Sequence, residues 1–437
     1  MTRSHSESAV SSTPSAPSTT RTATDVDAIA DRLADLSPEF AVYNGLPGRR
    51  GELDDYSPEG LTALSDLDRS TLRELDAVSP TDDVDRITVT AMRERLGVSV
   101  DLADAGEELR RLNVVASPVQ SLRDGFDNMP TRTEEDWADF ASALRDVPRA
   151  LDQYAQCLRL ALSCGDVAAR RQVEAAISQA RIQAAEDTSS YTALVDSAVT
   201  ADGAPLSAVM AEDLRSAAAT ARKGYVRIAQ VLTDEILPYA GDSDAVGRER
   251  YERFSRHFLG AVVDLDETYE WGRERLAAID AEQRAIAASL YGSGTTVAEA
   301  LDRLGADASR QLHGTAALQA WMQETSDAAI TALDGAQFDI PAPLRALECR
   351  IAPSSTGGIY YTAPSDDFSR PGRMWWSVPA GTQDFATWQE RTTVFHEGVP
   401  GHHLQIGMQT LLRDKLNSWR RHGCWVSGHG EGWALYA

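Results

Sequence analysis

Over most of the chain, apolar residues recur with the period of an α-helix. In the stretch 131–144, cap-type and acidic residues are followed by Trp137, Phe140 and Leu144, which fall on one helical face. Further helical patterns lie between turn-rich segments, at 168–198, 206–236, 245–259, 262–290 and 313–333. We therefore predict a mainly α protein in which residues 25–340 form the helical walls of a cleft.

The pattern changes near residue 340. Short apolar runs typical of β-strands appear at 349–352, 358–362 and 373–378. The turn-rich stretch 364–372 joins the last two runs, which predicts a β-hairpin. Helical spacing resumes near Phe385. We predict a small antiparallel sheet beside a catalytic region that spans residues 341–437.

Composition and charge indicate where the protein is located and which classes of partner it does not bind. Residues 1–24 are rich in Ser, Thr and Pro and lack the apolar core of a secretory signal, so we expect a disordered tail and a cytoplasmic protein. The net charge of -24 repels phosphate backbones and anionic lipids, which argues against nucleic acid and membrane partners. The four cysteines match no zinc or redox spacing, and we expect them to be reduced. The oligomeric state is left open.

Histidine and tryptophan gather toward the end of the chain. Five of the eight histidines lie between His396 and His429, and six of the nine tryptophans lie between Trp375 and Trp433. Imidazoles beside a dry aromatic wall are typical of a metal pocket. The distribution therefore indicates where the chemistry of this chain lies.

The segment from His396 to His402 reads His-Glu-Gly-Val-Pro-Gly-His. On a straight helix the sixth residue is rotated by about 240°, so His402 would face away from His396, while His403 would lie about 10 Å further along. Proline disrupts a helix and glycine permits unusual dihedral angles, so a bend at Pro400-Gly401 could bring His402 back beside His396. Glu397 would then be the carboxylate that takes a proton from a water on the ion.

A second motif follows after a glycine-rich loop. Glu431 opens a helical pattern there and is placed to be a third ligand from a second helix, although a carboxylate at a helix start can also serve the backbone amides. His429 could support the site or replace a ligand. His403 could ligate or pack, and His422, in a basic stretch, is expected on the surface.

Together, His-Glu-x-x-Pro-Gly-His and Glu-Gly-Trp-Ala-Leu-Tyr resemble the bacterial family catalogued as domain of unknown function 885, a relative of the zincin-like metallopeptidases with a glutamate ligand. The resemblance implies a zincin-like architecture and one Zn²⁺ ion held by His396, His402 and Glu431, with Glu397 as general base. Members of that family continue beyond the position of Ala437, so we expect a truncated chain that lacks part of the pocket.

Several other side chains are candidates for substrate contact. Tyr360, Tyr361 and Tyr436 could donate to a developing oxyanion, and Arg370 could bind a substrate carboxylate or stabilise its own turn. We predict a zinc metallopeptidase that cleaves peptide amides. A hydrolase of small non-peptide amides or esters, or an inactive helical binding protein, is the alternative.

Overall fold

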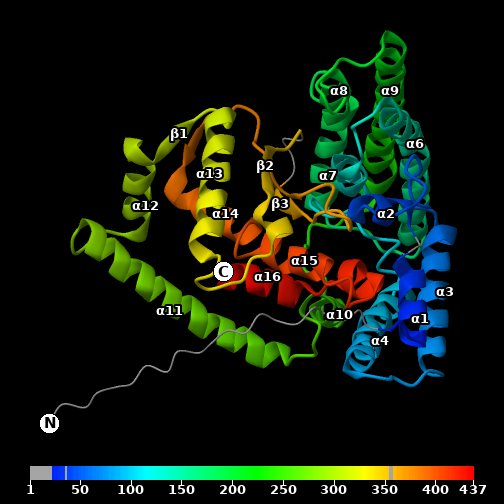
Figure 1. The fold of residues 1–437 in the computed structure, drawn as a ribbon, viewed down its shortest axis with the longest axis horizontal. Coiled ribbons are helices and arrows are strands. Elements are labelled where there is room, and N and C mark those ends of the chain that lie inside the picture. The colour runs from blue at the N-terminus through cyan, green and yellow to red at the C-terminus, as the bar shows by residue number, and fades with distance from the viewer. Residues whose placement is uncertain (1–21, 35–36, 354–357) are drawn as a thin grey trace.

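The computed structural model describes residues 22–34, 37–353 and 358–437, so most of the predicted tail, residues 1–24, lies outside the described residues. Helices dominate the fold, which confirms the prediction of a mainly α protein (Figure 1). The helices of the first half are α1 (Asp25–Ala34), α2 (Pro38–Asn44), α3 (Pro58–Leu75), α4 (Asp83–Asp104), α5 (Pro118–Asp124), α6 (Glu134–Ser163), α7 (Arg170–Ala184), α8 (Ser190–Asp196) and α9 (Ala208–Val231). Those of the second half are α10 (Arg248–Leu259), α11 (Leu265–Tyr291), α12 (Val297–Gly305), α13 (Thr315–Leu333), α14 (Thr387–Glu397), α15 (His402–Leu411) and α16 (Ser427–Tyr436).

The helices α6, α7 and α9 build an extensive apolar core away from the C-terminal motifs. Helix α6 begins after Thr133, whose hydroxyl accepts from the backbone N–H of Asp136 while the Asp136 carboxylate accepts from the backbone N–H of Thr133. Trp137, Phe140 and Leu144 are buried in this core, as their spacing predicted. This core stabilises the layer that α6, α7 and α9 form, and the rest of the chain packs against that layer.

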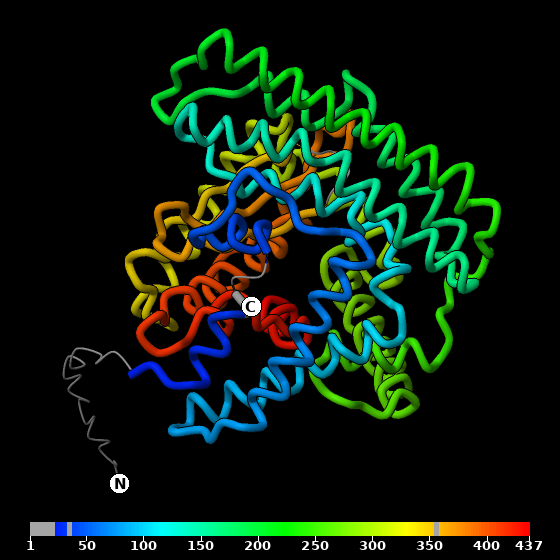
Figure 2. Tube along the Cα trace, turned by 90° about the vertical axis from the view of Figure 1, so that its right-hand side faces the viewer, coloured from blue at the N-terminus to red at the C-terminus, as the bar shows by residue number. Residues whose placement is uncertain are grey.

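The first helices of the chain lie beside its last ones. Figure 2 shows the blue N-terminal segment next to the red C-terminal segment. The Asn417 amide donates to Asp27 at 3.0 Å, and the backbone N–H of Ser418 donates to Asp31 at 2.9 Å, so α1 holds the loop that follows α15. Trp419 is buried in the same apolar cluster as α1 and α4. The N-terminal helices thus support the segment that leads into α16.

A small sheet separates the helical layer from the C-terminal motifs. Its strands are β2 (Leu347–Ile351), β3 (Ile359–Thr362) and β4 (Gly372–Trp376), in the order β2–β4–β3. The pair β3–β4 is antiparallel, which confirms the predicted hairpin. Strand β2 joins β4 in parallel, so the sheet is mixed, a feature that the sequence did not predict. Strands β1 (Gln311–His313) and β5 (Asp384–Ala386) form a second, antiparallel pair.

All four cysteines are free, as expected from their spacing. None of the described helices combines the length and the apolarity that crossing a bilayer requires.

Candidate metal centre

The helix that carries His396 stops one residue later and a new helix starts at His402. Between them, the backbone N–H of Gly401 donates to the carbonyl of Phe395 at 3.1 Å, which folds the chain back against the end of α14. A Cβ atom added at Gly401 would lie 1.9 Å from the His396 carbonyl oxygen, and one added at Gly398 would lie 2.6 Å from that of Val394. Only glycine fits at these two positions, and the helix is interrupted where the Pro-Gly step predicted.

This bend brings the two imidazoles face to edge. The ring centroids of His396 and His402 lie 4.7 Å apart, and their planes are inclined by 86°. His402 is buried, and burial lowers its pKa, so the imidazole is neutral near pH 7. A neutral imidazole has a free lone pair, which is the form that binds a metal ion.

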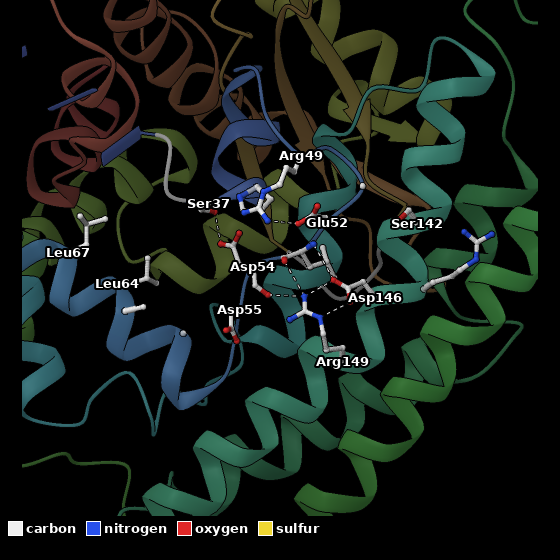
Figure 3. A pocket seen from close by; sticks show the side chains of 16 residues that line it. Ser37, Arg49, Glu52, Asp54, Asp55, Leu64, Leu67, Ser142, Asp146 and Arg149 are labelled. Atoms are coloured by element: carbon white, nitrogen blue, oxygen red, sulfur yellow. Dashed lines mark hydrogen bonds and ion pairs between the residues drawn. The ribbon is translucent and has the colours of Figure 1, made fainter. Parts of the chain in front are cut away.

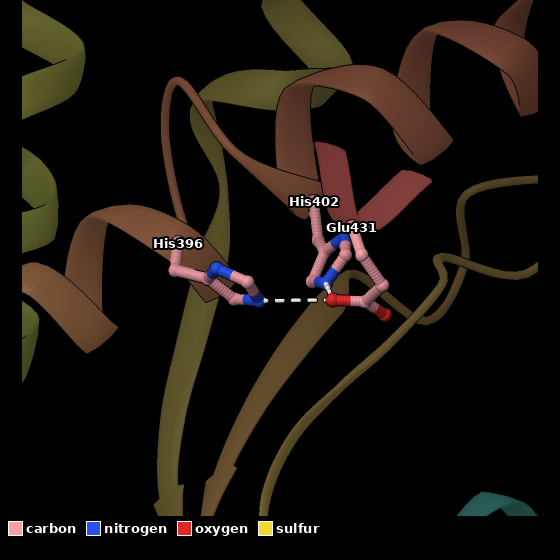
Figure 4. Close-up of side chains that lie close together, drawn as sticks. All are labelled: His396, His402 and Glu431. Atoms are coloured by element: carbon pink, nitrogen blue, oxygen red, sulfur yellow. Dashed lines mark ion pairs between the residues drawn. The ribbon is translucent and has the colours of Figure 1, made fainter. Parts of the chain in front are cut away.

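Helix α16 supplies the third side chain from a separate part of the chain. The Trp433 indole donates to the Pro400 carbonyl at 2.8 Å and so ties α16 to the bend. The carboxylate of Glu431 reaches between the two rings, with one oxygen 3.3 Å from Nε2 of His396 and 3.5 Å from Nε2 of His402 (Figure 4). A Cβ atom on Gly430 would lie 2.2 Å from Cη2 of Trp425, so this glycine lets α16 pack on the indole.

The spacing of these three groups can be compared with what a zinc ion needs. Ligand atoms about 2.0–2.1 Å from a tetrahedral ion lie roughly 3.4 Å from one another. The two measured separations are 3.3 and 3.5 Å, and one ligand atom from each residue lies within 4.8 Å of the others. The residues fit a divalent ion with nitrogen and oxygen ligands.

Glu397 lies next to this group and is shielded from solvent. The residue is 6% exposed and lines the same cavity as His396 and His402. Burial raises the pKa of Glu397 to about 8, and the negative charge of Glu431 adds to the effect. A carboxylate with a raised pKa is a stronger base than an exposed one, which suits it to proton transfer near neutral pH.

The three side chains open into a cavity of about 540 Å³. Its apolar and aromatic lining comes from β3, α15 and the loop before α16, and includes Ile359, Tyr360, Ile406 and Trp425. A volume of this size is in the range of small-ligand sites. The candidate centre is therefore accessible to a substrate and not only to an ion.

The sequence of this chain is similar to that of one described bacterial family. The sequence profile of a bacterial family described as "Bacterial protein of unknown function (DUF885)" matches residues 38–437. The chain belongs to the DUF885 family. Among curated proteins, the DUF885 sequence has no significant match.

Two solved structures resemble this DUF885 chain. One is a "putative lipoprotein" from Colwellia psychrerythraea, with a TM-score of 0.78 and 16% identity over 94% of this chain and 76% of that chain. The other, a "putative lipoprotein of unknown function" from Shewanella oneidensis, has a TM-score of 0.59 and 14% identity over 94% and 75%. At these identities the likeness concerns the fold. The cytoplasmic location predicted from the sequence finds no support in these comparisons.

His403 and Tyr361 form a hydrogen-bonded pair. Tyr361 lines the cavity and His403 does not. Nδ1 of His403 accepts from the Tyr361 hydroxyl at 2.9 Å, and Nε2 donates to the carbonyl of Leu344 at 2.8 Å. His403 is fully buried, which lowers its pKa to about 4. A Cβ atom on Gly372 would lie 2.2 Å from the Tyr361 hydroxyl oxygen, so glycine leaves space for this contact. The hydroxyl of Tyr361 is used by the fold, contrary to its predicted role toward substrate.

The polar groups of Tyr360 and Arg370 also form hydrogen bonds within the protein. The Tyr360 hydroxyl donates to Asp127 at 2.7 Å, although its ring lines the cavity. The Arg370 guanidinium donates to the carbonyls of Asn128 and Tyr43. Arg370 thus joins the turn after β3 to the helical layer and is not free to bind a substrate carboxylate, which was one of its two predicted roles.

The last two predicted residues lie away from the centre. Tyr436 is 88% exposed and His429 is exposed as well, and neither lines the cavity. Both belong to α16, but an α-helix turns by 100° per residue, so only one of its faces can point at the metal ligands. The structure does not bring His429 or Tyr436 to the candidate metal centre.

His422 was predicted on the surface, and that prediction is wrong. Its side chain is 1% exposed, lines the cavity and contacts Asp366 at 2.9 Å. Asp366 also pairs with Arg421, so the basic stretch before Gly423 turns inward to a carboxylate from the turn after β3. Sequence reasoning missed these cavity residues because their partner is more than fifty positions away and no local spacing marks it.

A larger hollow of about 890 Å³ lies between α3, α6 and the loop after α2 (Figure 3). Four of its charged residues are paired with one another, Arg149 with Asp146 and Arg49 with Glu52. Arg145 pairs with Asp213 outside the hollow. None of the residues that line it belongs to the two C-terminal motifs. The candidate ligands of the metal centre line the smaller cavity instead.

Proposed function

We propose that this protein is a zinc-dependent hydrolase with a zincin-like site that cleaves peptide amide bonds. The observation that carries the proposal is the convergence of His396, His402 and Glu431 from three helices on one point, with the buried carboxyl of Glu397 beside them. A site that only stabilised the fold would not need a base next to an open cavity. The DUF885 family itself is described without an activity.

Each residue has a distinct role in the proposed reaction. Nε2 of His396, Nε2 of His402 and a carboxylate oxygen of Glu431 would hold one Zn²⁺ ion, since these atoms lie close together. When bound, such an ion polarises a carbonyl and lowers the pKa of a coordinated water to about 7. Glu397 accepts a proton at its carboxylate oxygen as the water attacks the amide carbon. It then gives this proton to the leaving nitrogen as the C–N bond breaks.

The surroundings of the centre favour a peptide as substrate. Strand β3 is an edge strand of the sheet, and its residues Ile359, Tyr360 and Tyr361 line the cavity. Edge strands offer unpaired backbone groups to an extended peptide, which can add as a further strand. The Trp425 ring, whose centroid lies 6.1 Å from that of His402, adds an aromatic surface to the lining of the cavity.

Metal analysis with matched variants tests the proposal. Purified wild-type protein is expected to contain one zinc ion per chain, His396→Ala to lose it, and His429→Ala, an exposed histidine of α16, to retain it. Glu397→Gln is expected to bind zinc normally and to lose about 10²-fold or more in turnover, since it cannot accept the proton.

A panel of peptides and small amides or esters, each with a chelator control, identifies the substrate class. Cleavage of small esters but of no peptide would favour the alternative hydrolase. Zinc binding with no turnover of any substrate would favour a binding protein. Unchanged activity in Glu397→Gln would refute the mechanism.

A further inference from the structure

Helix α11 carries an apolar stripe that is open to solvent. Of its 27 residues, all of which the structure describes, only Ala287 is buried. Six large apolar side chains along it are between 50% and 68% exposed: Tyr269, Trp271, Leu276, Ile279, Ile286 and Leu290. Leu265 and Tyr291, at the two ends of the helix, are half-buried. Figure 1 shows the helix as an arm that stands away from the rest of the fold. A helix with an apolar stripe is normally stabilised by burying it. Among the described residues α12 contacts α11, but the six side chains named above stay exposed.

The stripe has the spacing of a coiled coil. Its positions alternate by four and three residues along the whole helix: Leu265, Tyr269, Gly272, Leu276, Ile279, Gln283, Ile286 and Leu290. This is the seven-residue repeat in which two helices pack their seams against each other. The helix is about 40 Å long at 1.5 Å per residue, so the seam offers an extended contact. Its spacing indicates a second helix as the partner.

We propose that α11 pairs with α11 of a second copy of this chain as an antiparallel coiled coil, with the two-fold axis at the level of Ala277 and Ala278. In this register Leu276 packs against Ile279 of the second copy and Tyr269 against Ile286. Leu265 faces Leu290 at the two ends of the contact. The remaining layer places Gly272 opposite Gln283, so that the long side chain enters the space left by the glycine, where a Cβ atom would meet nothing within 4 Å in this chain.

The charged residues that flank the seam support both a second copy of α11 as the partner and the antiparallel register described above. Arg273 of one copy lies opposite Asp280 of the other, and Arg275 lies opposite Glu282. Each pair occurs twice because of the two-fold axis. In the present chain Arg273 pairs with Glu270 at 3.4 Å and Asp280 pairs with an arginine one turn away at 2.8 Å. Such exposed pairs within one helix are weak and exchange readily.

Other arrangements of the same two helices are disfavoured. A slip by one heptad in one direction would place Arg273 against Arg273 and Arg275 against Arg275. A slip in the other direction would place Asp280 against Asp280. A parallel pair would leave a hole where two copies of Gly272 meet. The seam is therefore complementary to itself in one register, which argues for a second copy as the partner.

Sedimentation velocity of the full chain over roughly 1–100 µM tests the proposal, since one helix pair is smaller than a standard interface and a micromolar Kd is expected. Leu276→Asp with Ile279→Asp should be monomeric throughout. Two charge variants, R273E/R275E and D280R/E282R, should each weaken dimerisation about 10-fold or more. Their equimolar mixture should restore it, because opposite charges then face each other.

The matched control reverses two charges on the outer face of the same helix. Glu267→Arg with Glu274→Arg should leave the wild-type dimer unchanged, and circular dichroism should give the same helix content for every variant. Wild-type protein that stays monomeric at the highest concentration would overturn the proposal. So would a dimer that persists in the Leu276→Asp, Ile279→Asp variant, or a charge-variant mixture that fails to associate.

Discussion

Replacing Gly401 by alanine is expected to dismantle the metal centre while leaving the helical layer folded. A Cβ atom at this position would lie 1.9 Å from the His396 carbonyl oxygen and 2.5 Å from that of Phe395. Contacts of real Cβ atoms are essentially never under 3.0 Å, so the end of α14 and the start of α15 must separate by about 1.1 Å. Both clashing atoms are backbone, so no flexible side chain can move away to relieve the strain.

This displacement is large compared with what metal coordination tolerates. Ligand distances in zinc sites vary by roughly 0.2 Å, and a misplacement of about 1 Å can cost 10²-fold in rate. We expect Gly401→Ala to weaken zinc binding at least about 10-fold and to lower kcat/KM about 100-fold or more. Overpacking of this kind also costs about 1–3 kcal/mol of stability, which should appear as a lower Tm.

Competition titration with a zinc-binding dye measures the affinity, and a thermal melt followed by circular dichroism reports on the fold. Gly432→Ala is the matched control, because this glycine is the neighbour of Glu431 and a Cβ there meets nothing within 4 Å. It should bind zinc as the wild type does. If Gly401→Ala bound zinc with wild-type affinity, the bend would not be what brings His396 and His402 together.

Three further outcomes are expected. Tyr361→Phe leaves Nδ1 of buried His403 without a donor and should cost about 1–3 kcal/mol of stability, measured by urea unfolding, while the zinc content stays unchanged. Burial beside Asp54 raises the pKa of Glu39 to about 7, so the folded state holds a proton that the unfolded state releases near its ordinary value of 4.5. Stability should therefore fall as the pH rises from 4.5 to 7, and Glu39→Gln should flatten this dependence in urea titrations. Zinc at 100-fold above its Kd should add about 2.7 kcal/mol to the free energy of unfolding of the wild type, so removing it with a chelator should lower the Tm. The chelator should leave the Tm of His402→Ala unchanged. An equal shift in both proteins would exclude this site as the origin.

The sequence by itself determined the features that depend on neighbours in the chain. Helical spacing identified Trp137, Phe140 and Leu144 as a buried face because every turn of a helix repeats the same environment. The Pro400-Gly401 step marked the interruption between His396 and His402 for a similar reason, since proline and glycine act on the backbone where they stand.

Tertiary structure decided what depends on partners that are distant in the sequence. Strand β2 could have paired on either side and in either direction, and only the packed sheet fixes it parallel to β4. The Tyr361 hydroxyl went to His403 and the Arg370 guanidinium to backbone carbonyls, because buried polar groups must be paired and the nearest partners came from elsewhere in the fold. The sequence determined which residues are candidates for the proposed reaction, and packing decided which of them keep their polar groups free.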